Sequence, residues 1–575
     1  MRRIDRNPGS LEAVTDGWSE LFAAHGQTLL ETHLPAWLYR QRWFGAKTRK
    51  INKLKIISWA ELPSASVVDS ALPAFAEFAL DPATPPALFF IEVAYDDGDG
   101  DVYQVPLAVS KPASAESIQV HYPGAVVAKL AQPDGEAVLF DATVFEGSRQ
   151  ALLQLIGTGA SLELPNPRGG VLMARASTAF GPIRGFQYLP GRLGSAEQSN
   201  TSILYGNALI LKLFRRLQPG ENPDVEIGRF LTETAHFPHI APFLGDIAIA
   251  PQEGEKTTIA MLQGLVPNKG DGWEWFANRL GTFFASVATV PPPADQPAAS
   301  FLGDALVPPD LLQHCGETLA AAALLGQRTA EMHLALATPT TDPAFHAEPL
   351  NTEDLNRDAV RIQSQIDSAL HALKAAFNKL PAETIDEAAA LISRHGELLS
   401  KARDLTKGSA AGKRIRIHGD YHLGQTLRVG PGLKTGLTVP EAEGDFVLLD
   451  FEGEPARPLA DRRRKESPLR DVAGMLRSFS YAAHSALVKF LAIQEPTTEI
   501  SLRAWARCWE NAACSEFLRA YRSTIAKDPT ILPPPERAQT FVEAYVLEKA
   551  LYELLYELNS RPTWLRIPIA GILSL

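Results

Sequence analysis

The most informative segment of this chain is Ile415-Arg416-Ile417-His418-Gly419-Asp420-Tyr421-His422-Leu423-Gly424-Gln425-Thr426-Leu427. A short apolar run enters a polar loop that contains Asp420, and a second apolar pair leaves it. Further along, Phe446-Val447-Leu448-Leu449 forms an apolar run that ends in Asp450 and Glu452. Carboxylates therefore follow two predicted strands that are close in the sequence.

The spacing of these polar residues points to phosphoryl transfer. That reaction needs a carboxylate to orient and deprotonate the attacking hydroxyl, and oxygen ligands for the Mg²⁺ on the nucleotide phosphates. Protein kinases place a catalytic Asp five residues before a metal-binding amide, with a metal-binding Asp at the end of a following strand. Asp420, Gln425 and Asp450 have this arrangement. We therefore predict Asp420 as the catalytic base, and Gln425 and Asp450 as ligands of Mg²⁺, which keeps several waters. Taken alone, His-Gly-Asp also fits a loop with a capping Asp and a buried His.

A second set of residues is predicted to bind ATP. The turn before an apolar strand offers hydroxyls and amides that could cradle phosphates, namely Ser199, Asn200, Thr201 and Ser202. Lys212 lies in the returning strand, where an unpaired charge is costly, and Glu226 follows in a helix that begins at Asn222-Pro223. A Lys212–Glu226 pair would match the kinase arrangement, in which the lysine holds the phosphates. The alternative is an edge-strand lysine and a first-turn acid favoured by the helix dipole. We expect adenine to bind the backbone near Gln263.

The last long helix, at about 540–559, has two different faces. Leucines cluster on one face at helical spacing and indicate docking onto the core. The opposite face carries aromatic and charged side chains, which are Tyr545, Glu548, Lys549, Tyr552 and Tyr556. Flat rings mixed with hydrogen-bonding groups suit a sugar, whereas the alternative is an ordinary exposed surface stripe.

Several segments together resemble one enzyme superfamily. The loop is similar to that of the aminoglycoside and choline kinase-like phosphotransferases, and Gln425 with Asp450-Phe451-Glu452-Gly453-Glu454-Pro455 looks like the bacterial maltokinases. The same resemblance extends to Leu459-Ala460-Asp461-Arg462, Ser467–Met475, Gln41-Arg42-Trp43-Phe44-Gly45 and the last helix. Glucosamine kinases share the general loop pattern.

The resemblance implies a fold and an activity. The fold class is α+β: a bilobal protein-kinase-like fold with an N-terminal β-rich cap domain (1–135), a nucleotide-side lobe (136–266) and a mainly helical C-lobe (267–575). The implied activity is ATP-dependent phosphorylation of maltose to maltose 1-phosphate, which feeds α-glucan or glycogen synthesis from trehalose. Tyr545, Lys549, Tyr552 and Tyr556 would then contact maltose, with His418 and Glu452 beside it. His418 is also expected to shape the loop through hydrogen bonds.

Two other functions stay open at this stage. One is a glucosamine or other small-sugar kinase. The other is a non-catalytic carbohydrate-binding partner of trehalose synthase, against which the intact trio of Asp420, Gln425 and Asp450 argues. For the enzyme itself, trehalose synthase is a candidate protein partner.

Composition narrows the partners and the compartment. The 575 residues include 55 Lys+Arg and 66 Asp+Glu, a net charge of −11, which argues against binding to nucleic acid or anionic lipid. The three cysteines, Cys315, Cys508 and Cys514, have no disulfide or zinc spacing. The N-terminal residues do not lead into the apolar h-region of a signal peptide, and no run of 18 apolar residues occurs. We therefore expect a soluble cytoplasmic protein.

Overall fold

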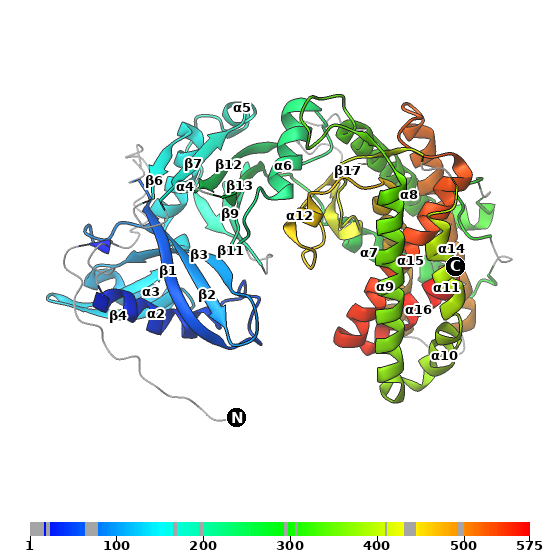
Figure 1. The fold of residues 1–575 in the computed structure, drawn as a ribbon, viewed down its shortest axis with the longest axis horizontal. Helices are drawn as coiled ribbons and strands as arrows, with labels where there is room; N and C mark the ends of the chain where they lie inside the picture. The colour runs from blue at the N-terminus through cyan, green and yellow to red at the C-terminus, as the bar shows by residue number, and fades with distance from the viewer. Residues whose placement is uncertain are drawn as a thin grey trace. The chain divides into compact units, whose positions relative to one another are not determined.

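The computed structural model describes residues 17–18, 24–63, 79–164, 169–194, 199–251, 254–292, 297–304, 307–408, 411–430, 444–492 and 499–575. The chain forms two compact units, coloured mainly blue to green and green to red in Figure 1. The N-terminal unit comprises Met1–Arg229 and Ala241–Val266, and the C-terminal unit comprises Phe230–Ile240 and Pro267–Leu575. Among the described residues, no helix is both long and apolar enough to cross a membrane.

The first sheet of the N-terminal unit is antiparallel, in the order β1-β2-β3-β5-β4, with β11 added beside β3. Its strands are β1 (Ile51–Glu61), β2 (Ala87–Tyr95), β3 (Asp101–Val109), β4 (Val126–Gln132), β5 (Gly135–Asp141) and β11 (Arg216–Leu217). The segment Asp96-Asp97-Gly98-Asp99-Gly100-Asp101 contains two Asp-Gly pairs, which predict a hairpin turn from the sequence, and the pairing of β2 with β3 confirms it. Two helices accompany this sheet, α2 (Ala24–Leu38) and α3 (Pro112–His121). Because β4 pairs with β5, the sheet continues past the expected boundary at residue 135 to Asp141.

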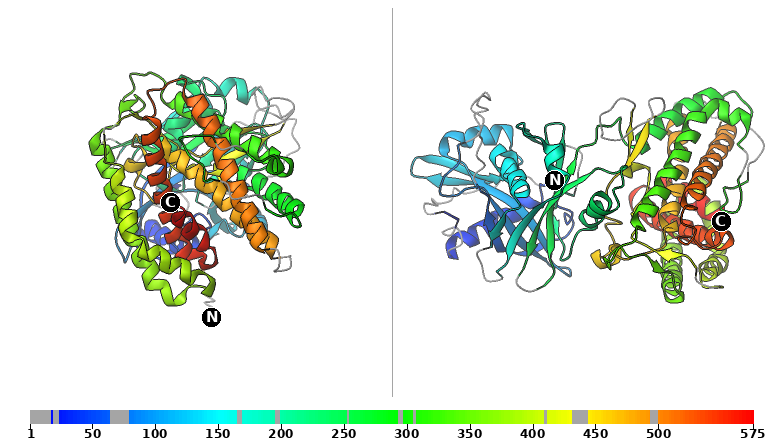
Figure 2. Two further views of the ribbon diagram at one scale, coloured as in Figure 1. Left: turned by 90° about the vertical axis from the view of Figure 1, so that its right-hand side faces the viewer. Right: turned by 90° about the horizontal axis from the view of Figure 1, so that it is seen from above.

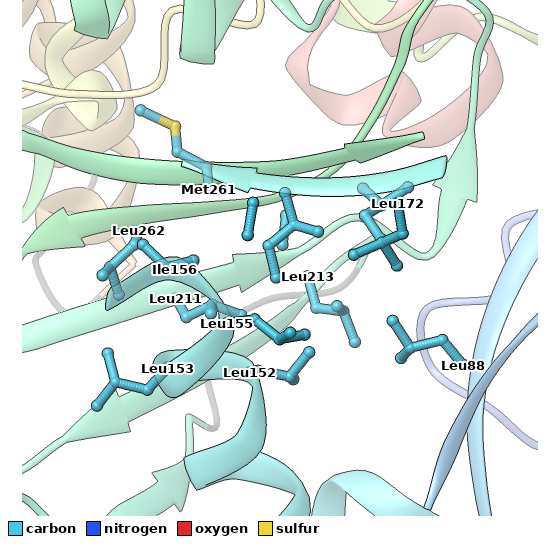
Figure 3. Packing of buried hydrophobic residues seen from close by; sticks show 14 of the residues in the cluster. Leu88, Leu152, Leu153, Leu155, Ile156, Leu172, Leu211, Leu213, Met261 and Leu262 are labelled. Carbon is cyan, nitrogen blue, oxygen red and sulfur yellow. The ribbon is translucent and has the colours of Figure 1, made fainter. Parts of the chain in front are cut away.

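The second sheet has seven strands in the order β6-β7-β12-β13-β10-β9-β8. They are β6 (Ser161–Glu163), β7 (Val171–Ala176), β8 (Gly191–Leu193), β9 (Thr201–Tyr205), β10 (Leu209–Leu213), β12 (Phe243–Ala250) and β13 (Thr257–Gly264). The helices of this part are α4 (Glu146–Thr158), α5 (Phe180–Arg184) and α6 (Pro223–Arg229). Figure 3 shows leucines of α4 among apolar side chains of β7, β10 and β13. Leu88 of the first sheet belongs to the same cluster, so both sheets share one hydrophobic core.

Arg215 connects the two sheets of the N-terminal unit. Its guanidinium is 1% exposed, donates from Nη2 to Asp141 Oδ2 at 2.7 Å, and donates from Nε to Thr201 Oγ1 at 2.8 Å. The same group lies 4.7 Å from the ring centroid of Trp43. Asp141 ends β5 of the first sheet and Thr201 begins β9 of the second. A buried charge therefore joins the β-rich cap to the strand that follows the predicted phosphate-binding turn.

The C-terminal unit is mainly helical (Figures 1 and 2). Its helices are α7 (Gly272–Val287), α8 (Pro309–Leu336), α9 (Thr352–Ala376), α10 (Ile385–Ser393), α11 (His395–Asp404), α12 (Leu459–Arg462), α13 (Leu469–Leu491), α14 (Glu499–Ile525), α15 (Pro535–Ser560) and α16 (Arg566–Leu573). Two short ribbons complete it, β14 (Glu348–Pro349) with β15 (Lys413–Arg414), and β16 (Thr426–Val429) with β17 (Asp445–Leu448).

Local sequence signals explain where several of these helices begin. Asn351 and Asp354 form a capping box at the start of α9, and Asp271 caps α7 by accepting from the Glu274 amide. Figure 1 shows α9 and α15 running alongside each other, and α13 also packs against α15. The α+β class with an N-terminal β-rich cap and a mainly helical C-terminal part is confirmed. The boundaries of the three predicted domains stay a prediction.

Replacing Arg215 with Met should destabilise the N-terminal unit. The substitution keeps most of the side-chain volume but leaves the Asp141 carboxylate buried without its cation, a change that typically costs about 3–5 kcal/mol. We expect a lower thermal unfolding temperature by calorimetry. As a matched control, Arg49→Met removes an exposed ion pair with Asp97 and should change the free energy of unfolding by less than about 1 kcal/mol. Equal stability of the two variants would contradict a structural role for Arg215.

Candidate active site

The β16–β17 ribbon brings two predicted metal ligands together. Thr426 pairs with Leu448, so the residue before β16 and the residues after β17 lie at the same end of the ribbon. There Gln425 Nε2 donates a hydrogen bond to Asp450 Oδ2 at 3.1 Å. An oxygen of Glu452 lies within 4.8 Å of an Asp450 carboxylate oxygen. Asp450 has a φ of +64°, a left-handed conformation that non-glycine residues adopt rarely and that often marks functional sites.

The loop that carries Asp420 is hydrogen-bonded to the buried carboxylate of Asp471, which lies in the first turn of α13. Asp471 accepts from the backbone amides of His418 and Gly419 at 2.8 and 2.9 Å. His333 Nε2 lies 3.1 Å from the same carboxylate, and its other ring nitrogen lies 2.9 Å from Tyr521 Oη. Burial raises the pKa of Asp471, but the His333 hydrogen bond and the nearby histidines outweigh burial and lower it overall. An ionised anchor therefore fixes the backbone immediately before Asp420.

Two glycines make this close packing possible. Gly419 has a φ of +83°, which favours glycine directly before the predicted base. A Cβ on Gly474 would lie 2.5 Å from the carbonyl oxygen of Tyr421, so α13 can lie against the loop only with glycine there. One turn further, Ser478 Oγ accepts from the Leu423 amide at 3.0 Å. Helix α13 thus supports the loop along its length.

Asp420 is paired with a lysine from α15. Lys549 Nζ lies 3.0 Å from Asp420 Oδ1 and 2.8 Å from Glu454 Oε1. Burial lowers the pKa of Lys549, but the charges of Asp420 and Glu454 outweigh burial and raise it above its ordinary value. The ammonium also lies 5.0 Å from the ring centroid of Tyr552. Lys549 therefore stays charged at neutral pH, and its ammonium lies directly against the carboxylate of Asp420.

Two cavities adjoin Lys549 and Tyr552. The smaller, the polar cavity, has a volume of about 40 Å³ and is lined by Asp420, Glu454, Arg470, Tyr545 and Glu548, among others. The larger, the aromatic cavity, has a volume of about 420 Å³. Its walls include the aromatic side chains Trp273, Tyr481, Tyr552, Tyr556 and Trp564, together with His422 and Gly424 of the loop. The rings of Tyr481 and Trp564 stack with centroids 6.5 Å apart. A cavity of this size with aromatic walls is typical of small-molecule sites.

The predicted sugar-binding residues have different surroundings. Tyr545 is 2% exposed and donates to Asp358 Oδ2 at 2.8 Å, so it forms part of the wall of the polar cavity. Tyr552 lines both cavities, and half-exposed Tyr556 lines the aromatic one. The alternative of an exposed stripe is wrong for Tyr545 and Glu548, because both are buried.

The side chain of His418 is buried and hydrogen-bonded within the loop, as expected for a residue that shapes the loop. Its ring is buried between Tyr421 and Phe451, and Nε2 lies 2.8 Å from the carbonyl oxygen of Leu449. This contact links the Asp420 loop to the residue before Asp450. The geometry supports the hydrogen-bonding role more strongly than direct contact with a sugar.

The predicted nucleotide residues lie on the seven-stranded sheet of the N-terminal unit. Lys212 is in β10, between β9 and β13, so the edge-strand alternative is wrong. Its side chain is 16% exposed and forms an ion pair with Asp224 at 3.0 Å. Asp224 lies two residues before the expected partner Glu226, which is also buried in α6.

The other predicted nucleotide residues surround that lysine in the sheet. Ser202 pairs with Lys212 across β9 and β10, and Thr201 begins β9. Ser199 and Asn200 precede that strand. Gln263 lies in β13 opposite Ile210 of β10.

Sequence reasoning missed three groups that shape the site. Asp471 and Glu454 occur inside segments that carried the family resemblance, but neither had a predicted role. Asp224 had a local signal, because an acid in a helix's first turn next to a proline is common. Only the fold shows that these carboxylates contact the loop backbone, Lys549 and Lys212, respectively.

Comparisons with known proteins bear on the family and the fold. Residues 37–144 match the family described as the maltokinase N-terminal cap domain. A solved glucosamine kinase in complex with glucosamine, ADP and inorganic phosphate aligns over 98% of this chain and 99% of its own, with a TM-score of 0.60 and 19% identity. The chain has a maltokinase cap on a glucosamine-kinase-like fold. The protein-kinase-like class predicted from the sequence is thereby confirmed.

Two curated relatives are similar in sequence. A glucosamine kinase of Streptacidiphilus jiangxiensis is 24% identical over 388 residues, covering 66% of this chain and 72% of the relative. A glucosamine kinase of Mycolicibacterium smegmatis is 27% identical over 393 residues, covering 66% and 78%.

The donor set at the end of the β16–β17 ribbon fits Mg²⁺. Asp450 and Glu452 offer carboxylate oxygens and Gln425 offers an amide oxygen, which are the ligand types that Mg²⁺ prefers. Thiolate or paired imidazole ligands, which would favour zinc, are not found at this end among the described residues. Gln425 and Asp450 are therefore the side chains that would hold the ion, and Mg²⁺ would offset phosphate charge.

Asp450→Ala should raise the Mg²⁺ concentration needed for half-maximal activity more than Gln425→Ala, because a carboxylate supplies charge and an amide only a dipole. Magnesium titrations of turnover at saturating ATP measure this difference. Asp461→Ala is the matched control, since Asp461 of α12 forms an ion pair with Arg464, beyond the end of that helix. An unchanged magnesium dependence in Asp450→Ala would remove Asp450 from the metal site.

Proposed function

We propose that this protein is an ATP-dependent sugar kinase that phosphorylates maltose at C1 to give maltose 1-phosphate. The observation that carries the proposal is the ion pair between Asp420 and Lys549, because Lys549 also lines the aromatic cavity. A candidate base is thus held at the edge of a cavity suited to sugar rings. The maltokinase cap supports maltose as the acceptor.

The chemistry assigns a role to each group. Asp420 accepts the proton of the attacking sugar hydroxyl while that oxygen forms a bond to the γ-phosphorus and ADP departs. The Asp471 anchor and Gly474 hold Asp420 in place, which converts an encounter into an oriented attack. Lys212, paired with Asp224, is the candidate for holding the nucleotide phosphates, with Ser199, Asn200, Thr201, Ser202, Glu226 and Gln263 as further candidates on the nucleotide side.

The cavity supports a disaccharide more than a single small ring. Its volume of about 420 Å³ and its several aromatic side chains offer more than one stacking surface. Tyr552 lies next to Lys549, whereas Tyr481 and Trp564 form a separate stacked pair. The names of the relatives make glucosamine the second candidate acceptor. Formation of maltose 1-phosphate in the cytoplasm would feed α-glucan synthesis from trehalose, with trehalose synthase as a candidate partner.

An acceptor assay tests this proposal. With ATP, Mg²⁺ and maltose, the protein should release ADP and form a product whose phosphate NMR spectrum shows an ester at C1. Asp420→Asn should reduce turnover by about 10²–10⁴-fold while the fold is retained, because the amide cannot accept the proton. A protein that ignores maltose but phosphorylates glucosamine would move the assignment to the second candidate. Failure to consume ATP with any sugar would leave the carbohydrate-binding alternative.

The aromatic wall gives a separate prediction. Tyr552→Ala should raise the KM for maltose several-fold more than the KM for ATP, since it removes a ring from both cavities of the C-terminal unit. Tyr122→Ala, on an exposed tyrosine that follows α3, is the matched control and should change neither constant. Equal increases in both KM values for Tyr552→Ala would indicate a general structural effect.

A further inference from the structure

Lys549 has an unusual position for a lysine in a sugar site. Its ammonium lines both cavities and lies within 3.0 Å of two carboxylates, those of Asp420 and Glu454. The two carboxylates raise its pKa above the ordinary value despite burial. Lys549 therefore keeps its positive charge across the physiological pH range, and this charge lies beside the Asp420 carboxylate, which would accept the proton of the sugar hydroxyl.

The remaining carboxylates around the cavities also have partners. Glu548 pairs with Arg361 and Arg470, whose charges outweigh burial and lower the pKa of Glu548 to about 2. Glu553 and Glu557 form ion pairs of 2.7 Å with Arg477 and Arg561. Asp471 contacts His333 and the loop amides, and Asp271 caps α7. Among the described residues that line the cavities, each carboxylate thus already has a cation or backbone donors as partners, and Asp420 and Glu454 share the single charge of Lys549.

This pattern of charges disfavours a positively charged acceptor. A substrate ammonium would meet the Lys549 charge and would find its possible partners already engaged. Because Asp420 and Glu454 would attract an ammonium, the positive charge of Lys549 between them offsets part of that attraction and lowers the preference for a charged acceptor. Specificity of this kind comes from a repulsive group as much as from an attractive one.

We propose that Lys549 determines acceptor specificity by excluding amino sugars, so that the site selects neutral sugars over sugars that carry an ammonium group. This inference rests on the proposed sugar kinase function but not on maltose in particular. Replacing Lys549 with a neutral residue removes the repulsion and also leaves Asp420 and Glu454 without their shared cation. The same pocket then becomes anionic and attracts an ammonium.

The experiment compares glucose with glucosamine, which differ only in the group at C2. Activity with ATP and Mg²⁺ gives kcat/KM for each sugar in the wild type, Lys549→Gln and Lys549→Arg. We expect the glucosamine-to-glucose ratio to rise at least tenfold in Lys549→Gln and to stay within about threefold of the wild type in Lys549→Arg. Absolute turnover is expected to fall in both variants, because Asp420 loses or shifts its partner, but the ratio cancels that loss.

Two further controls separate charge from structure. Lys401→Gln removes a lysine of α11 that pairs with Glu543 of α15, and it should leave the ratio unchanged. N-acetylglucosamine has a C2 nitrogen without a charge, so its ratio to glucose should not rise in Lys549→Gln. If Lys549→Gln turns over too slowly to measure, calorimetry gives the ratio of the binding affinities for glucosamine and glucose, and this ratio should rise in the same variant.

The outcomes for this inference and for the maltose assignment are distinct. A ratio that does not rise in Lys549→Gln, or that rises equally in Lys549→Arg, would overturn the role of Lys549. A wild-type preference for glucosamine over glucose would also overturn it. Failure to use maltose, with neutral monosaccharides still preferred over glucosamine, would reject the maltose assignment while supporting the exclusion of amino sugars.

Discussion

The buried carboxylate of Asp471 is the constraint on which the active-site geometry depends. Burying a charge is costly unless hydrogen bonds compensate, and here two backbone amides and His333 supply them. Its place in the first turn of α13 adds the favourable field of the helix N-terminus. Because the two amides belong to His418 and Gly419, satisfying this one charge also fixes the direction in which the chain enters Asp420. Gly474 and Ser478 then let the same helix support the rest of the loop.

Between that loop and the two cavities, the buried charged side chains form ion pairs with one another. Lys549 is shared by Asp420 and Glu454, and arginines from α9, α13 and the end of α15 pair with Glu548, Glu553 and Glu557. Each pair joins α15 to a neighbouring element or to itself. Breaking such a pair leaves an uncompensated buried charge, so the network holds the aromatic side chains of α15 in one arrangement even if each pair adds little net stability.

The N-terminal unit shows the same coupling between packing and polar groups. The cap sheet and the seven-stranded sheet share one hydrophobic core, in which Leu88 meets leucines of α4. Arg215 then adds a polar connection from Asp141 to Thr201. The cap is therefore continuous with the part of the protein that carries Lys212. Lys212 itself forms an ion pair with Asp224 inside this unit.

The sequence by itself determined the features that depend on local pattern. The strand that precedes Asp450 and the β2–β3 hairpin follow from apolar runs and turn chemistry, and both recur in the structure. Only the tertiary structure decided which charges meet. Lys549 and Asp420 are 129 residues apart, and Asp471 lies 53 residues beyond His418. Tyr545 has helical spacing like Tyr552, yet it is buried against Asp358. Periodicity shows which residues share a face of a helix. The burial and the partners of those residues depend on what packs against that face, and those neighbours come from distant parts of the sequence.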